Sequence, residues 1–198
     1  MELSTAIRTR RMTRSYTDEP VDPSVVDTML DAAVRAPSAG FSQGWDFLVL
    51  DRPEDVARYW ATTTDPDGEP DSWLRGMRRA PVLIVACSHR GAYLDRYAEP
   101  DKGWTDRDER RWPVPYWHLD TAMAVMLMLL TAQDAGLGAC FFGVPTEATD
   151  ALRSAFGIPA DRTPIGVVSV GHRGEELVRG SARRGRRPQD DVVHRGSW

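Results

Sequence analysis

The spacing of apolar residues along the chain predicts helices and strands that alternate. Apolar residues recur at helical spacing, and helices are predicted at residues 3–13, 23–35, 53–62, 72–79, 118–135 and 147–156. Strands are predicted at residues 46–51, 82–88 and 165–171. The second strand contains a continuous apolar run, which is typical of a strand that is covered on both faces. Because helices and strands interleave, the pattern predicts an α/β or α+β fold.

The helix predicted at residues 118–135 is apolar on nearly all sides. Such a helix must be covered on more than one side. It is either the central helix of one core or a helix that packs against its symmetry mate in a dimer, and its own residues leave both arrangements open. Its apolar stretch at residues 122–130 is too short to span a bilayer, so no membrane anchor is expected.

Length and composition favour one ordinary globular domain. The chain has 198 residues, of which 41% are hydrophobic, so it can bury a substantial core. Its two cysteines, Cys87 and Cys140, lie in apolar surroundings without the spacing of a metal site or a disulfide framework. We expect both thiols to pack in the core, no metal to be bound, and a cytoplasmic location, since the first residues do not resemble a secretory signal.

A turn of small polar residues follows the helix at 23–35. Pro37 ends the helical pattern, and Ser38, Ala39 and Gly40 form a sterically thin turn whose backbone amides can approach a flat ligand. The Gln43 carboxamide adds a donor and an acceptor for the edge of a heteroaromatic ring. An ordinary helix-to-strand turn before a buried tryptophan is the alternative interpretation.

Arginine is concentrated at the two ends of a chain that is acidic overall. The formal net charge is −4, yet residues 1–14 and residues 172–198 are each net positive, and arginine supplies all of that positive charge. The guanidinium fork matches phosphate oxygens, so the two ends would form an anion site if they met. Solvated tails are one alternative and nucleic-acid binding is another; the acidic balance and the aromatic residues placed elsewhere disfavour nucleic acid.

Four motifs, in order along nearly the whole chain, resemble those of the FMN-dependent nitroreductase family. The family's R-R-S-x-R motif corresponds to residues 10–14, A-P-S-x-x-N-x-Q-P-W to residues 36–45, a glycine-rich segment after a long helix to residues 136–145, and K/R-x-R before proline to residues 184–188. Three positions depart from the family pattern: Met12 replaces serine, Phe41 replaces asparagine and Gly44 replaces proline.

The resemblance implies a fold and an assembly. It implies an α+β, three-layer α/β/α domain over residues 1–198 with a central mixed, mainly antiparallel sheet. It also implies a lid-like excursion at residues 91–117, a C-terminal arm at residues 172–198, and a homodimer with the long helix and the flavin at its interface. The residues implied to bind FMN are Arg10, Arg11, Met12, Arg14, Pro37, Ser38, Ala39, Gly40, Phe41, Gln43, Phe142, Gly143, Val144, Arg184 and Arg186.

The excursion at residues 91–117 is rich in aromatic side chains interleaved with charged ones. The resemblance makes it a lid over the flavin, and its rings suit flat, electron-poor substrates. The alternative is a surface excursion whose rings pack down on the domain. The predicted substrate-pocket residues are Phe41, Tyr93, Tyr97, Trp104, Trp112 and Tyr116.

The implied activity is that of a flavin-dependent oxidoreductase. Hydride would pass from NAD(P)H through FMN to a nitroaromatic, a quinone or a similar small aromatic oxidant in a ping-pong cycle, with the flavin rather than a side chain carrying the chemistry. His118 and His89 are expected to be structural. A flavoenzyme of the same fold that uses a deazaflavin donor or oxidises a natural-product intermediate is the main alternative; a non-catalytic anion- or nucleic-acid-binding protein is the other.

Overall fold

The structure is a computed structural model that describes residues 1–65, 67–175 and 184–198. Its strands are β1 (Trp45–Leu50), β2 (Val82–Ser88), β3 (Gly138–Phe142) and β4 (Thr163–Gly171). Its α-helices are α1 (Leu3–Thr9), α2 (Pro23–Ala33), α3 (Pro53–Thr63), α4 (Ser72–Met77), α5 (Arg90–Ala98), α6 (Tyr116–Asp134) and α7 (Thr149–Phe156). None of the described helices is long and apolar enough to cross a membrane.

The four strands form one sheet in the order β1-β2-β4-β3. Each neighbouring pair runs antiparallel, with Leu48 opposite Val85 and Val85 opposite Val167. A mixed sheet was expected, but among the described residues parallel pairing is limited to an isolated bridge between Met12 and Ala139. The sheet is therefore an antiparallel one with a short parallel contact at its β3 edge.

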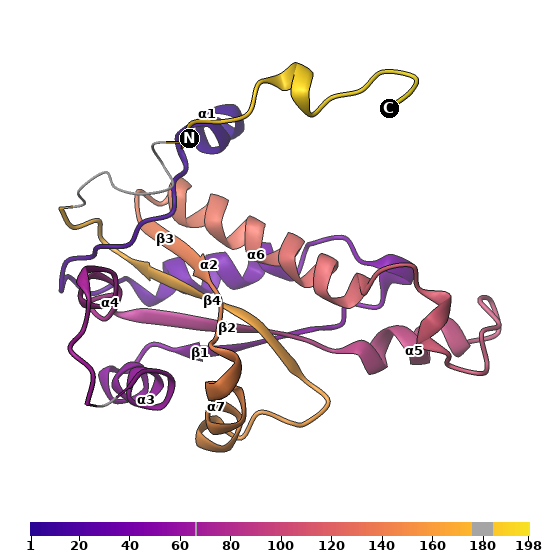
Figure 1. The fold of residues 1–198 in the computed structure, drawn as a ribbon, viewed down its shortest axis with the longest axis horizontal. Helices are drawn as coiled ribbons and strands as arrows, with labels where there is room; N and C mark the ends of the chain where they lie inside the picture. The colour runs from indigo at the N-terminus through magenta and orange to yellow at the C-terminus, as the bar shows by residue number, and fades with distance from the viewer. Residues whose placement is uncertain (66, 176–183) are drawn as a thin grey trace.

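Helices cover both faces of this sheet, which confirms the three-layer α+β fold (Figure 1). Helices α2 and α6 pack on one face, against side chains such as Ile84 of β2. Helices α3, α4 and α7 cover the other face, where Val85 and Cys87 point. All of β2 is buried, as its continuous apolar run predicts. Cys87 and Cys140 are both buried, and burial raises the pKa of Cys87 to about 11.

Most elements predicted from the sequence agree with the structure. The end of the first helix differs, and one strand and one helix were missed. The first helix ends at Thr9 rather than at residue 13, because residues 11–14 run extended beside β3 and Thr13 N–H donates to Ala139 O at 3.0 Å. Strand β3 was missed because glycine and alanine dilute its apolar pattern. Helix α5 was missed within the excursion at residues 91–117, where its apolar positions are mixed with charged ones.

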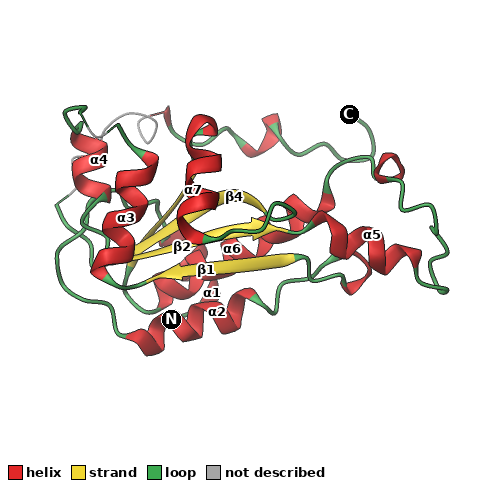
Figure 2. Cartoon of the chain, turned by 90° about the horizontal axis from the view of Figure 1, so that it is seen from below, coloured by secondary structure: helices red, strands yellow, loops and turns green. Residues whose placement is uncertain are grey.

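Two segments extend from the layered body. Helix α5 and the chain after it continue past the end of β1 and β2 (Figure 2). The described part of the C-terminal arm, residues 184–198, runs away from the sheet (Figure 1). Trp198 at its end is fully exposed.

Candidate functional site

The loop at residues 38–43, which the sequence predicts to hold the flavin ring, has a strained backbone. Gly40, Phe41 and Gln43 all have positive φ, at 61°, 58° and 49°. The left-handed region suits glycine, but it costs energy for phenylalanine and glutamine and persists only where the surroundings enforce it. Within the loop, Ser38 Oγ accepts from Gln43 N–H at 2.9 Å. This bond closes the loop into a compact turn.

A buried carboxylate on α6 holds the same loop from outside. Asp120 is only 2% exposed, and its Oδ2 accepts both the Ala39 N–H and the Tyr93 hydroxyl at 2.8 Å. Burial, together with the hydrogen bond to Asp120, raises the pKa of Tyr93 far above its usual value, so this hydroxyl remains a donor. Arg96 on α5 adds a third bond, from its Nε to Gly40 O at 2.9 Å. Sequence reasoning missed Asp120 and Arg96; the available signal was an acidic residue near the start of an apolar helix.

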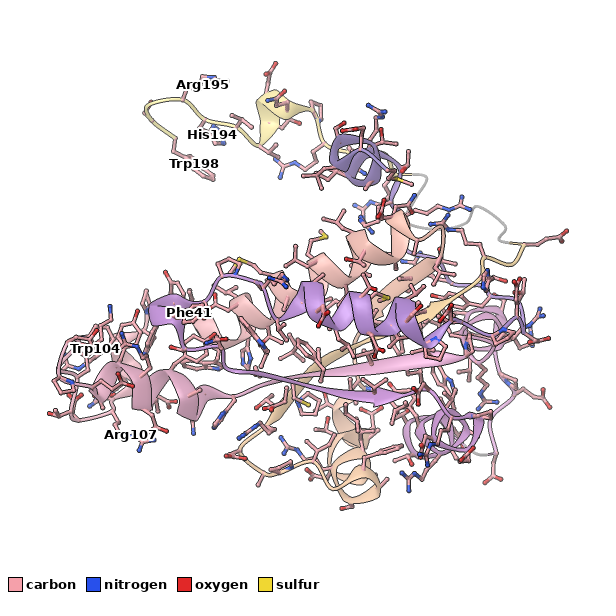
Figure 3. The ribbon with its side chains drawn as sticks, turned by 180° about the vertical axis from the view of Figure 1, so that it is seen from behind. Phe41, Trp104, Arg107, His194, Arg195 and Trp198 are labelled. Atoms are coloured by element: carbon pink, nitrogen blue, oxygen red, sulfur yellow. The ribbon has the colours of Figure 1, made fainter. Side chains whose placement is uncertain are left out.

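Aromatic rings of α5 press directly on this loop. A Cβ added to Gly44 would lie 2.4 Å from Tyr93 Cε2, and one added to Gly40 would lie 2.6 Å from Tyr97 Cε2. Glycine at both positions therefore permits the close contact between helix and loop. Phe41, by contrast, is 72% exposed and lies at the same end of the molecule as Trp104 (Figure 3).

The aromatic residues predicted to line the substrate pocket, except Phe41, form one cluster around Trp112. The Trp112 ring centroid lies 4.5 Å from that of Tyr97, 5.6 Å from Trp104 and 5.5 Å from Tyr116. Tyr93, 5.8 Å from Trp112, is fully buried in this chain and forms the base of the cluster. The alternative interpretation, in which the rings pack down on the domain, therefore holds for Tyr93. The partly exposed rings remain predicted substrate contacts.

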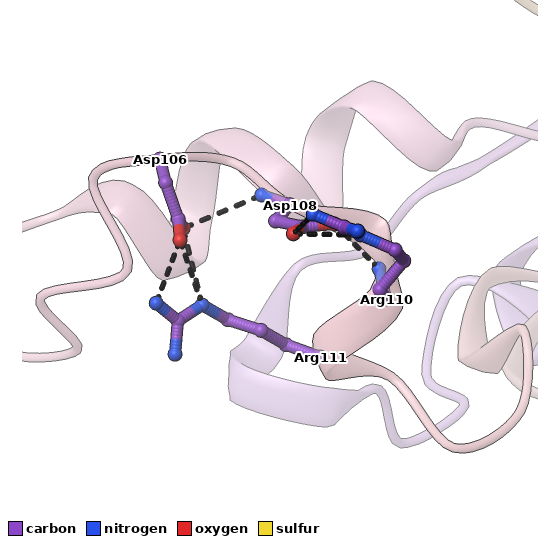
Figure 4. A network of polar contacts seen from close by, with 4 residues as sticks. All are labelled: Asp106, Asp108, Arg110 and Arg111. Carbon is purple, nitrogen blue, oxygen red and sulfur yellow. Dashed lines mark hydrogen bonds and ion pairs between the residues drawn. The ribbon is translucent and has the colours of Figure 1, made fainter.

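Arginine–aspartate pairs fasten the tip of the excursion at residues 91–117. Asp106 and Asp108 accept paired hydrogen bonds from Arg111 and Arg110, respectively (Figure 4). Hydrogen bonds from the Arg110 side chain and backbone lower the pKa of Asp108 to about 2. Arg107 pairs with Asp95 of α5 at 2.7 Å, which ties the tip back to the helix.

The arginine run at residues 10–14 lies beside β3. Met12 Sδ accepts from Phe141 N–H at 3.4 Å, so the methionine that replaces the family's serine turns inward. Arg11 and Arg14 are exposed, and Arg14 donates to Met12 O at 3.3 Å. Arg10 is partly buried, and its Nη1 is buried without a hydrogen-bond partner among the described residues. A buried cationic N–H without an acceptor is costly, and a bound anion would remove that cost.

The arginine run and the 38–43 loop lie at opposite ends of α6. Near its C-terminal end, Gln133 donates to Thr9 Oγ1 at 3.1 Å, next to Arg10 in the chain. Near its N-terminal end, Asp120 holds Ala39. At about 1.5 Å per residue, the helix from Asp120 to Gln133 is about 20 Å long. A single chain therefore does not bring these two predicted halves of the site together.

The remaining predicted cofactor residues divide between packing and exposure. Phe142 stacks on Trp60, with ring centroids 5.8 Å apart and planes within 6°, so its ring belongs to the core under α3. Val144 packs against the same core, and Gly143 is exposed with open space around it. Arg184 and Arg186 are exposed on the arm, and the residues that connect the arm to the domain, 176–183, lie outside the described ones.

Comparison with known proteins identifies the family. The model of the nitroreductase family matches residues 7–172, so the chain belongs to the nitroreductase family. A relative from Methanothermobacter thermautotrophicus, provisionally named NADH dehydrogenase/NAD(P)H nitroreductase, is 30% identical over 177 residues, covering 88% of this chain and 79% of the relative.

Solved structures agree with this assignment. A nitroreductase family protein from Streptococcus pneumoniae has the same fold, with a TM-score of 0.75 at 20% identity over 98% of this chain and 99% of that one. A protein from Desulfovibrio desulfuricans, provisionally described as a nitroreductase and solved in complex with FMN, has a TM-score of 0.69 at 25% identity, covering 98% of this chain and 95% of that one.

Proposed function

We propose that this protein is an FMN-dependent oxidoreductase that takes hydride from NAD(P)H and passes it to a nitroaromatic, quinone or similar flat acceptor. In this proposal the chain is one flavin-binding domain, with its lid at residues 91–117 and an arm at residues 172–198. The buried Arg10 Nη1, which has no hydrogen-bond partner among the described residues, is the observation that carries the proposal. Family membership and the FMN complex of a structural relative support it.

The residues present fit the cofactor at both of its ends. A phosphate would accept a hydrogen bond from the buried Arg10 Nη1, for which the described part of the chain supplies no acceptor, and exposed Arg11 and Arg14 would add charge around it. The strained, externally held 38–43 loop offers a surface of fixed shape to a flat ring, with the exposed Phe41 side chain at its edge. FMN, when bound, supplies the acceptor and donor of hydride, and the chain supplies its binding and orientation.

A homodimer would complete this site. Helix α6 exposes an apolar stripe, with Leu119 at 48%, Met123 at 41% and Met126 at 45% exposure, spaced so that they share one face. Across a two-fold axis perpendicular to α6, the helix and its mate would pack with their ends reversed. That arrangement would bring the 38–43 loop of one protomer toward Arg10 of its partner, which the distance of about 20 Å forbids within one chain. The dimer would thus bury the stripe and assemble two flavin sites.

The aromatic cluster of the lid supports a flat acceptor. Tyr97, Trp104, Trp112 and Tyr116 are partly exposed, Tyr97 lies against Gly40 of the loop that would hold the flavin, and Phe41 presents its ring from the loop itself. Rings with exposed faces favour a planar aromatic ligand by offset stacking. The proposed substrate therefore stacks between the lid and the flavin.

The test is the visible absorption spectrum of the purified protein, followed by anaerobic addition of NADPH and, separately, of NADH. Flavin bands that bleach with one donor and return on addition of 1,4-benzoquinone are the expected result, and they name the reductant. A colourless protein that takes up no FMN on reconstitution would overturn the proposal. A flavoprotein that neither nicotinamide reduces would keep the cofactor and exclude NAD(P)H as the donor.

A further inference from the structure

The 38–43 loop carries its strain at residues that do not favour it. Phe41 and Gln43 have side chains, yet both adopt left-handed φ angles, and Phe41 has little burial to compensate. Such a conformation is kept only by contacts from neighbouring elements. The atoms that enforce it therefore decide where the loop amides and the Phe41 ring point.

Two elements enforce it through three polar bonds. On α6, Asp120 accepts from Ala39 N–H and from Tyr93 O–H, both at 2.8 Å. On α5, Arg96 donates to Gly40 O at 2.9 Å, and its guanidinium is oriented by Asp101 at 2.7 Å. Since Tyr93 also belongs to α5, the lid helix reaches the loop by a direct bond and by a bond through Asp120.

We propose that Asp120 is a positioning residue that fastens the lid helix α5 to the 38–43 loop, so that both keep a single geometry for flavin and aromatic substrate. The inference rests on the proposed function for the identity of the ligands. The fastening itself is a property of the chain without them. Asp120 touches neither ligand in this scheme and acts through Ala39 and Tyr93.

Close packing links the contact between α5 and the loop to a position where this chain departs from the family motif. The Tyr93 ring occupies the space that a side chain at residue 44 would need, with Cε2 at 2.4 Å from the position of a Cβ. Gly44, which replaces the family's proline, therefore permits Tyr93 to approach, and this approach lets its hydroxyl reach Asp120. Gly44 and Tyr93 thus act together to position the Tyr93 hydroxyl, and Gly44→Ala should disturb the same hydrogen bond as Tyr93→Phe.

The experiment compares Asp120→Asn, Tyr93→Phe and the double variant. Each single variant should raise the Kd for FMN about tenfold, because a hydrogen bond to a buried charge is lost or weakened. The double variant should be no worse than the weaker-binding single variant, since both changes break one linked unit. With 1,4-benzoquinone as acceptor, KM should rise about tenfold while kcat changes less than about twofold.

Hydrogen exchange of the apoprotein gives a readout that needs neither ligand. The Ala39 amide should exchange faster in Asp120→Asn and in Tyr93→Phe than in the wild type. The matched control is Tyr59→Phe, which removes the hydroxyl of another fully buried tyrosine in the core under α3. It should leave exchange at residue 39, FMN affinity and KM unchanged.

The outcomes separate the two proposals. If FMN binds the wild type but its Kd, the quinone KM and Ala39 exchange are unaltered in Asp120→Asn and Tyr93→Phe, the fastening is wrong and the proposed function stands. If the wild type binds no FMN, the proposed function fails. Faster Ala39 exchange in the two variants would then still support the fastening, and unchanged exchange would overturn it.

Discussion

The two ends of α6 differ in how completely their polar groups are paired. At the N-terminal end, the 38–43 loop is strained but fully held, with Asp120 and Arg96 each bonded to its backbone. At the C-terminal end, the backbone of the arginine run is paired with β3, but the Arg10 guanidinium has a buried nitrogen without a partner among the described residues.

This difference shows which part of the candidate site has its binding geometry in the absence of a ligand. A strained loop held by buried hydrogen bonds is a preorganised surface, whose cost is met during folding. An unpaired buried cation instead leaves a cost that a bound anion removes. The ring end is therefore expected to give orientation, and the phosphate end to give most of the binding energy. Four predictions test this contrast, from the largest effect to the smallest.

Met126→Glu should dissociate the proposed dimer and so separate the 38–43 loop of one protomer from Arg10 of its partner. A carboxylate at Met126, the last residue of the apolar stripe of α6, would be buried without a partner in the dimer, which costs several kcal/mol. We expect the dimer Kd to rise at least about a hundredfold, and FMN retention to be lost with it. Analytical ultracentrifugation measures the first effect and absorbance measures the second.

Val34→Glu is the control for the dimer prediction, because Val34 is also exposed but lies at the end of α2. It should leave both measurements unchanged. A Met126→Glu protein that remains dimeric and yellow would show that α6 is not at the interface.

Arg10→Met should weaken FMN binding while sparing the apoprotein. The loss of charge-assisted bonds to phosphate corresponds to roughly 3 kcal/mol, or about a hundredfold in Kd. The free energy of unfolding of the apoprotein should be equal or higher, because the unpaired buried Nη1 is removed. Fluorescence titration with FMN and urea denaturation measure the two quantities.

Arg8→Met provides the comparison for Arg10, since Arg8 is an exposed arginine of α1 only two residues before Arg10. Its FMN affinity should match that of the wild type. Equal losses in the two variants would mean that only the general positive charge of the N-terminal region matters.

Trp112→Ala should damage the ring end selectively. Trp112 contacts Tyr93, Tyr97, Trp104 and Tyr116, so its loss leaves a cavity at the centre of the cluster and destabilises the protein by roughly 3 kcal/mol. We expect KM for an aromatic acceptor to rise, with FMN occupancy retained at saturating FMN. Loss of flavin equal to that in Arg10→Met would contradict the division between the two ends.

His118 gives the smallest effect, through pH. Burial lowers the pKa of His118 below its ordinary value of 6.5, so the unfolded chain binds this proton more readily than the folded one. Its contribution to the free energy of unfolding is therefore fully present above pH 6.5 and is lost as the pH falls below it. Urea denaturation of His118→Gln at about pH 8 and about pH 5 should show a smaller decrease than the wild type. An identical decrease would mean that another group titrates.

Much of the architecture could be predicted because it depends on local pattern. The apolar run at 82–88 predicts a strand covered on both faces, and β2 is buried throughout. The glycines after the helices at 118–135 and 147–156 adopt the positive φ that a C-terminal cap requires, at Gly136 and Gly157. The motifs at residues 10–14 and 36–45 likewise indicated the two ends of the candidate site, since they are contiguous in sequence.

The missed features depend on contacts between residues far apart in the chain. Residues 11–14 lie beyond the first helix because Thr13 pairs with Ala139, which no local pattern reports. Asp120 binds Ala39 across 81 positions of sequence, so its role in holding the loop is invisible until α6 and the loop are placed together.

The sequence by itself determined the layered fold, the family and the residue types that suit phosphate and a flat ring, because these follow from periodicity and short motifs. Only the tertiary structure decided that the two predicted halves of the site lie at opposite ends of α6, that Met12 turns inward, and that Arg10 retains a buried nitrogen without a partner among the described residues. The physical reason is that burial and pairing belong to a three-dimensional neighbourhood, which distant segments create together.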